Sequence, residues 1–167
     1  MKFAVNITLV MLVSSCSNNS ERAMEKFRGM WKLDKYESLD SASGKWKDSP
    51  NRIGYTGYIL YDGIGHMGVQ LLPPEFKNVD NNKSIDSLGI EELRKTLRLH
   101  TTSFSYFAVC DVANANSIQH HRLSSNNPKE WGTTTMRTFE FKGDTLILTA
   151  NELIAGFKTR LRWIKLH

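Results

Sequence analysis

The stretch TMRTFEFKGDTLILTA, residues 135–150, decides the fold. Its first run alternates polar and aromatic residues, its second is rich in Leu, Ile and Thr, and Gly143-Asp144 stands between them. Side chains of a β-strand point alternately to opposite faces, and a Gly-Asp pair suits a tight hairpin turn. The stretch therefore predicts two antiparallel strands, each with one face directed at a core.

Similar short runs follow one another along most of the chain, separated by Gly, Asn, Asp and Pro, which is typical of antiparallel β proteins. The expected strands are Gly29–Leu39, Ile53–Asp62, Gly65–Leu71, Ser103–Val112, Ser117–Leu123, Thr133–Phe141, Thr145–Ala150 and Thr159–Leu166. Eight up-and-down strands can close a barrel with room for one small ligand. We therefore expect an all-β fold, a single antiparallel up-and-down eight-stranded barrel.

One segment has a helical pattern instead. Apolar Ile90, Leu93 and Leu97 recur at helical spacing in residues 90–99, with acidic residues before basic ones, as the helix dipole favours. This predicts one short α-helix between the third and fourth strands. The Pro- and Asn-containing residues 72–82 before it predict a loop. Loop and helix together either cap one barrel mouth or form a long surface connection.

The N-terminus carries an apolar segment that follows Lys2 and ends at Val13. It is too short to span a bilayer, which takes about 20 residues, and is typical of a signal peptide. Val13-Ser14-Ser15-Cys16 resembles a bacterial lipobox, which implies cleavage before Cys16 and attachment of diacylglycerol to its thiol. We expect residues 1–15 to be a lipoprotein signal peptide, residues 16–27 the lipidated Cys and a flexible, helix-poor tether, and residues 28–167 one barrel domain.

This resemblance implies a protein of the cell envelope, held at a bacterial membrane by its lipid. Ser17 directly after Cys16 is similar to the pattern of lipoproteins sorted to an outer membrane. Several acyl chains, at about 0.8 kcal/mol per buried methylene, anchor a protein far more firmly than one. An ordinary signal peptide, with export but no lipid, is the alternative.

Composition and motifs exclude several other classes. The formal net charge is +5, from 22 Lys and Arg against 17 Asp and Glu, and no basic run is interleaved with aromatics, so we expect no nucleic-acid partner. With Cys16 lipidated, Cys110 is left as a lone buried thiol. There is no Gly-rich phosphate loop or Ser-centred nucleophile motif. Adjacent His120 and His121 cannot both ligate one central metal, so we expect neither metal nor cofactor.

The order of several segments resembles the bacterial lipocalin-like domain family over about residues 27–163. The segments that carry the resemblance are Gly57–Tyr61, Asp62–Leu71, Tyr106–Val112, His120-His121, Pro128 with Trp131-Gly132, and Arg137–Leu148. The resemblance implies a lipocalin-like barrel. It also implies that Trp31 on the first strand closes the barrel base under an arginine of the last strand, either Arg160, our first choice, or Arg162.

Candidate ligand-binding residues are polar side chains on otherwise apolar strand faces. Arg137 shares a face with Phe139 and Phe141, and a buried cation there needs an anionic partner, either a ligand carboxylate or a structural ion pair. Tyr106 adds a hydroxyl to an apolar strand face, and only one of His120 and His121 can point inward. The full set of candidates is His66, Gln70, Tyr106, His120, His121, Trp131 and Arg137.

Three functions follow from these residues. The leading hypothesis is a non-enzymatic, membrane-anchored barrel that binds a small hydrophobic or amphipathic ligand. The second is an isomerase, cyclase or hydrolase that uses His66 or His120 as acid–base and Tyr106 or Arg137 to stabilise oxyanion charge. The third is a structural envelope module with a filled core. Whether the barrel encloses a cavity decides among them.

Overall fold

The computed structural model describes the chain at residues 14–79, 83–154 and 156–167, with side chains from residue 21 onward outside those gaps. Most of the expected signal peptide, residues 1–13, lies outside the described residues, as do residues 80–82 of the expected loop. Within the described part of the chain, no helix is long and apolar enough to cross a membrane.

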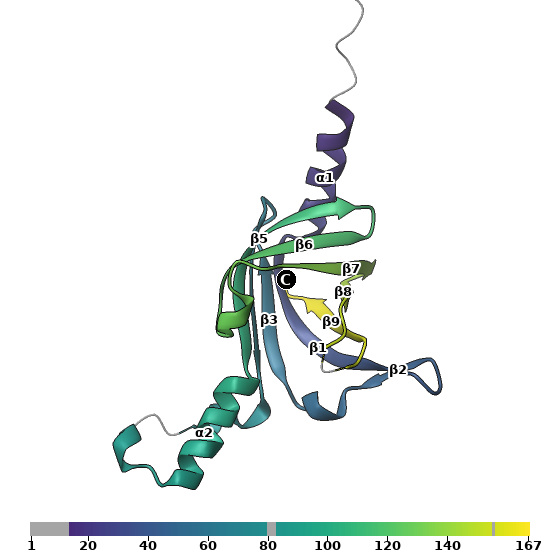
Figure 1. Cartoon of the computed structure of the whole chain (residues 1–167). Helices are drawn as coiled ribbons and strands as arrows, with labels where there is room; N and C mark the ends of the chain where they lie inside the picture. Colours follow the sequence, from purple (N-terminus) through teal and green to yellow (C-terminus); the bar gives the residue numbers. More distant parts are fainter. Residues whose placement is uncertain (1–13, 80–82, 155) are drawn as a thin grey trace, which may run out of the picture.

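The fold is a closed antiparallel β-barrel of eight strands, extended by a ninth (Figure 1). The strands are β1 Gly29–Asp40, β2 Lys45–Asp48, β3 Thr56–Tyr61, β4 His66–Leu72, β5 Phe104–Asn114, β6 Ser117–Ser125, β7 Thr134–Lys142, β8 Thr145–Ala150 and β9 Thr159–Lys165. Each of β3–β9 pairs with its neighbour in sequence, β3 also pairs with β1, and β1 pairs with β9 to close the ring. The expected eight-stranded up-and-down barrel is confirmed.

The additional strand β2 was not expected. It forms a hairpin with the second half of β1, through a turn in which Asp40 accepts hydrogen bonds from Ala42 and Ser43 and Gly44 adopts a φ of 64°. None of its residues, Lys45 to Asp48, is buried. A strand with no apolar face directed at the core leaves no alternation in the sequence, so pattern reasoning passes over it.

The two ends of the barrel differ. The turns β3–β4, β5–β6 and β7–β8 lie at one end, together with helix α1, Ser14–Phe27. The longer connections lie at the other end and contain the 3₁₀ turns η1 Pro50–Arg52, η2 Pro74–Asn78, η3 Ile85–Ser87 and η4 Pro128–Glu130. We call the first end the base and the second end the mouth.

Helix α1 corrects the expectation of a helix-poor tether at residues 16–27. Its second half, Glu21 to Lys26, consists of Glu, Arg, Ala, Met and Lys, all strong helix formers. Met24 and Phe27, three residues apart and so on one side of the helix, are buried in the core. The barrel base therefore stabilises the helix, and the expectation of a single helix is wrong.

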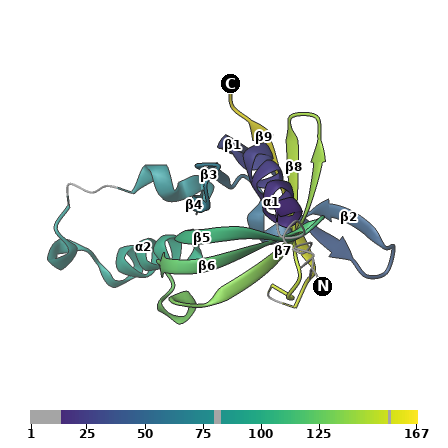
Figure 2. The ribbon, with the colours of Figure 1, turned by 90° about the horizontal axis from the view of Figure 1, so that it is seen from above.

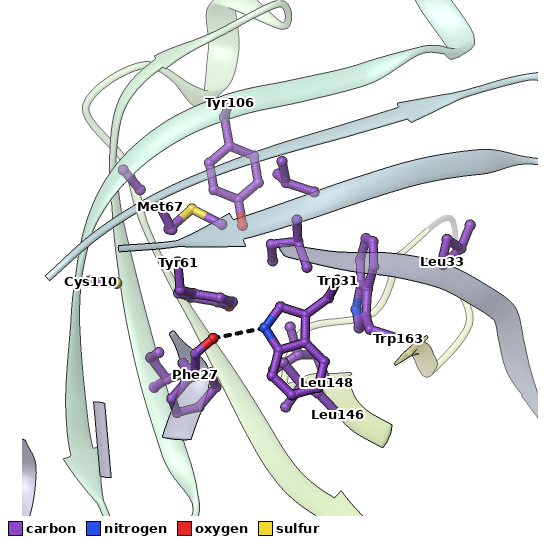
Figure 3. Packing of buried hydrophobic residues seen from close by; sticks show 14 of the residues in the cluster. Phe27, Trp31, Leu33, Tyr61, Met67, Tyr106, Cys110, Leu146, Leu148 and Trp163 are labelled. Atoms are coloured by element: carbon purple, nitrogen blue, oxygen red, sulfur yellow. Dashed lines mark hydrogen bonds between the residues drawn. The ribbon is translucent and has the colours of Figure 1, made fainter. Parts of the chain in front are cut away.

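The core of the base is aromatic (Figure 3). The fully buried ring of Phe27 lies 4.9–5.0 Å, centroid to centroid, from the rings of Tyr61, Phe139 and Phe141. The indole of Trp31 donates a 2.7 Å hydrogen bond to the carbonyl oxygen of Phe27. The last residue of α1 thus plugs the barrel and accepts a bond from its first strand.

Helix α2, Ile90–Thr102, projects from the mouth end as an arm (Figures 1 and 2). It confirms the helix expected over residues 90–99 and runs three residues further. Because β2 adds a strand, α2 lies between the fourth and fifth strands rather than the third and fourth. None of its residues is buried, and its ring contact is between His100 and Phe76 of η2, 5.3 Å apart. Only its last turn reaches the barrel mouth.

Candidate functional site

A cavity of about 640 Å³ opens at the mouth of the barrel. One wall is apolar and comes from β3, β4, β8 and β9, with Ile59, Val69, Leu71, Leu148, Leu161 and Trp163. The other wall is polar and comes from β6, β7 and the loops beside them, with His120, Arg122, Glu130, Arg137 and Glu152. The volume is within the usual range for small-molecule sites, about 300–1,000 Å³.

A buried imidazole with two tyrosines lies at the inner end of the polar wall. His120 receives contacts at both ring nitrogens, 3.1 Å from the Tyr61 hydroxyl to Nε2 and 2.7 Å from the Tyr106 hydroxyl to Nδ1. Strand alternation directs all three side chains inward from β3, β5 and β6. A neutral imidazole has one donor and one acceptor nitrogen, so one tyrosine donates to it and the other accepts from it.

Burial keeps this cluster uncharged. Burial, together with the nearby cations of Arg137 and Arg122, lowers the pKa of His120 to about 3. Burial also raises the pKa of Tyr106 to about 12 and that of Tyr61 well above its ordinary value. At neutral pH the imidazole therefore gains no proton and the two tyrosines lose none. General acid–base catalysis works best with a pKa near the working pH, so the cluster is poorly suited to it.

Arg137 lies in the polar wall, on the same face as Phe139 and Phe141, and its Nη1 has three protein partners. This nitrogen lies 2.6 Å from acceptor oxygens of Glu152 and Thr135 and 3.0 Å from the carbonyl oxygen of Met136, and its two hydrogens are shared among the three acceptors. The hydrogen bond from Arg137 and its charge lower the pKa of Glu152. Of the two partners considered from sequence, the structural ion pair is the one present.

Arg122 is a buried cation of the same wall, on the inner face of β6 with His120, and it was not among the predicted candidates. Its Nη1 donates a 2.9 Å hydrogen bond to Thr133, and its guanidinium carbon lies 5.1 Å from the centroid of the Tyr106 ring. Its Nε is 3.6 Å from a carboxylate oxygen of Glu130 and is buried without a hydrogen-bond partner. Arg122 is thus less completely bonded than Arg137.

Three predicted ligand-binding residues point away from the cavity. On β4 the buried positions are Met67, Val69 and Leu71, so His66 and Gln70 lie on the outer face. His66 bonds there to Asp62 at 2.6 Å, and His121 bonds to Thr134 and Asp111 on the outside of β6. The expectation that His66 and Gln70 face a ligand is wrong because the apolar residues of β4 occupy the inner face.

Trp131 is the remaining candidate. It follows η4, is 58% exposed, and its indole N–H donates to the carbonyl oxygen of Ser125. It is not among the residues that line the cavity. The predicted candidates that the structure does bring together in the cavity wall are Tyr106, His120 and Arg137.

The expected closure of the base by Trp31 and Arg160 is also corrected. The cation over the Trp31 ring is Lys165 of β9, with its Nζ 5.2 Å from the ring centroid. Arg160 instead bonds to Glu37 at 2.7 Å and stacks on Trp46 at 4.4 Å, near the mouth. The last strand does supply a cation to Trp31, but strand direction brings its end, not its start, to the base.

Sequence reasoning missed Tyr61, Glu130 and Glu152 as well as Arg122. Tyr61 alternates with Ile59 on β3, so the strand pattern contained a signal for it. Glu130 and Glu152 lie in loops, where no periodicity indicates direction. Within the described residues, no three His, Cys, Asp or Glu side chains are grouped as a metal site. Cys110 is buried and free, and burial raises its pKa to about 12.

A closed antiparallel barrel with an amphipathic cavity at one end defines a class of small-ligand-binding barrels. A family model described as a lipocalin-like domain matches residues 28–164, and the chain therefore belongs to the lipocalin-like domain family. The resemblance in the sequence is thereby confirmed. A search of the curated proteins gives no match to this chain.

Proposed function

We propose that the barrel binds one small amphipathic molecule, with its apolar part against β3, β4, β8 and β9 and its polar part against β6 and β7. The observation that carries this proposal is the cavity of about 640 Å³ with one apolar and one polar wall. A filled core would have favoured the structural module. Ligand sites of this kind combine a mainly apolar lining with a few placed polar groups.

The cavity favours binding over catalysis. The acid–base hypothesis named His66 or His120 as the acid–base, and His66 lies on the outer face of β4. The pKa of His120 is about 3, so its imidazole is neutral at neutral pH and binds a further proton poorly. The cluster of His120 with Tyr61 and Tyr106 is better suited to donating or accepting a hydrogen bond at a fixed position.

Binding can be tested with the neutral fluorescent probe N-phenyl-1-naphthylamine and a pair of tryptophan variants. Val69→Trp fills the inner face of β4, whereas Gln70→Trp places the same side chain on the outer face. We expect the parent and Gln70→Trp to bind the probe with one-to-one stoichiometry and Val69→Trp to lose it. Native mass spectrometry and lipid extraction of the parent identify any molecule that copurifies.

Two outcomes contradict the proposal. One is a parent that neither binds the probe nor carries a molecule. The other is equal probe binding by both tryptophan variants, because the probe would then lie outside the cavity. Far-UV circular dichroism and melting temperature show whether Val69→Trp remains folded, and a smaller change, Val69→Phe, replaces it if it does not.

We further propose that Cys16 carries the lipid that holds the barrel at a bacterial membrane, with the outer membrane favoured. The support is the lipobox-like Val13-Ser14-Ser15-Cys16 and the position of α1, which leads from Cys16 to the base. An anchor there leaves the mouth directed away from the anchoring lipid. We expect the parent and a Cys110→Ala control to partition into detergent and Cys16→Ala to remain in the aqueous phase. Unchanged partition of Cys16→Ala contradicts lipidation.

A further inference from the structure

Two residues of the cavity wall contain buried hydrogen-bond donors without acceptors. Among the described side chains, Arg122 Nε and Trp163 Nε1 are buried without a partner, and both residues line the cavity. A buried donor without an acceptor destabilises the protein, and more strongly when it is charged. Trp163 belongs to the apolar wall and Arg122 to the polar wall, so the polar wall lacks an acceptor at Arg122 Nε.

The nearest carboxylate does not supply the missing bond. Glu130 is 3.6 Å from Arg122 Nε, while its two oxygens accept bonds from Ser125 at 3.5 Å and Asn127 at 3.3 Å. Glu130 thus balances the charge of Arg122 without completing its hydrogen bonds. Arg137, bonded to Glu152 and Thr135, has no such deficit.

The charges of the wall favour an acceptor with one negative charge. The cavity is lined by three arginines, Arg52, Arg122 and Arg137, and two glutamates, Glu130 and Glu152, so these side chains sum to 3 − 2 = +1. A monoanion neutralises this sum. A dianion such as a phosphate monoester would give the occupied cavity a net negative charge, and the two glutamates would repel it.

We propose that Arg122 binds the carboxylate of an amphipathic monocarboxylate, with Tyr106 beneath it and the apolar chain against the opposite wall. This inference rests on the proposed function and specifies the head group. A guanidinium and a carboxylate form charge-assisted hydrogen bonds, stronger than neutral ones. The Tyr106 ring under the guanidinium and the bond to Thr133 hold the side chain in place for the ligand.

The fold also sets the direction of the ligand. Strand β6 runs from the base to the mouth, and Arg122 lies one inward position nearer the mouth than His120. Its partners Thr133 and Glu130 belong to the loop at the mouth. The carboxylate therefore lies near the mouth, and the apolar chain extends inward along Val69 and Ile59.

The test compares dodecanoate with 1-dodecanol, two ligands of the same chain length that differ in the charge of the head group. Each is measured by displacement of N-phenyl-1-naphthylamine from the full chain, stripped of bound lipid. We expect the parent to bind dodecanoate at least about tenfold more tightly than dodecanol, since about 1.4 kcal/mol is a factor of ten. Arg122→Gln should abolish this preference, with the affinities for dodecanoate and dodecanol compared within the same variant so that any change in probe binding cancels.

Two further variants control the experiment. Arg122→Lys retains the charge but not the planar fork, so it should keep part of the preference. Arg94→Gln removes an exposed arginine of α2 and should keep all of it. If the parent binds the probe but prefers neither ligand, or Arg122→Gln keeps the preference, the carboxylate site is wrong and ligand binding stands. If the parent binds none of the three compounds, both proposals fail.

Discussion

At the base the barrel is filled by aromatic rings, whereas at the mouth it is lined by charged side chains around a cavity. Phe27 contacts three rings at the base. Neither these four rings nor Trp31 lines the cavity. At the mouth, Arg122 and Arg137 bond mainly to side chains from strand ends and loops. One strand ring thus supports a packed end that provides stability and a polar end that can bind a ligand.

The difference shows how the fold divides stability and binding along its axis. Aromatic packing at the base needs no partner beyond the chain itself and is worth several kcal/mol per ring. The polar wall at the mouth costs desolvation, which its internal bonds offset only in part, as the incompletely bonded Arg122 shows. A binding end that is incompletely satisfied alone is stabilised further when a ligand occupies it.

The largest effect is expected from breaking the base. Phe27→Ala removes a fully buried ring that contacts Tyr61, Phe139 and Phe141, and it should lower the free energy of unfolding by about 3–5 kcal/mol. Urea unfolding measures the loss. Phe157→Ala, which removes a 56% exposed ring near the mouth, is the control and should change stability by less than about 0.5 kcal/mol. Equal losses in the two variants would mean that α1 does not plug the barrel.

The next effect concerns the inner end of the polar wall and depends on pH. The pKa of His120 is about 3 in the folded chain and has its ordinary value of 6.5 in the unfolded chain. Between these two values His120 is protonated in the unfolded chain but not in the folded chain. Stability is therefore complete above pH 6.5 and decreases as the pH falls. At pH 5, the loss relative to the stability well above pH 6.5 should be about 2 kcal/mol.

Two histidine variants isolate this contribution. His120→Gln can still donate and accept hydrogen bonds but cannot titrate, so urea unfolding should show a flatter dependence on pH between 5 and 6.5. His121→Gln, on the outer face of the same strand, should keep the dependence of the parent. A parent whose stability does not change over this interval would contradict the burial of His120.

These two regions also differ in how far the sequence predicted them. The strands, the closed ring and the inward faces of Tyr106 and Arg137 follow from alternation, because a strand with one buried face has a period of two. Alternation also requires that one of His120 and His121 points inward, and the structure shows that it is His120. The same rule, applied to the polar face of β4, wrongly placed His66 and Gln70 inside, although Met67, Val69 and Leu71 formed the more apolar face. The inner face of a strand is the face with more apolar residues, even where the opposite face carries polar side chains that could bind a ligand.

Other features had no local signal. Strand β2 buries no residue, and the partners of Arg122 and Arg137 reach the cavity from loops. The plug formed by Phe27 depends on a contact between residues more than a hundred positions apart, such as that with Phe139. The sequence therefore predicts which strands form the wall, while long-range contacts and loops decide which charges in it are balanced.

The smallest effect is expected in the α2 arm, which belongs to neither region. Leu97 is 64% exposed and α2 has no buried residue, so Leu97→Ala should change the free energy of unfolding by less than about 0.5 kcal/mol. Leu71→Ala, which shortens a buried leucine of β4 in the cavity wall, should cost about 2–5 kcal/mol and serves as the matched comparison. Both are measured by urea unfolding under the same conditions. A loss above about 1 kcal/mol for Leu97→Ala would show that the apolar side of α2 packs against the barrel in solution, so that the arm covers the mouth rather than projecting from it.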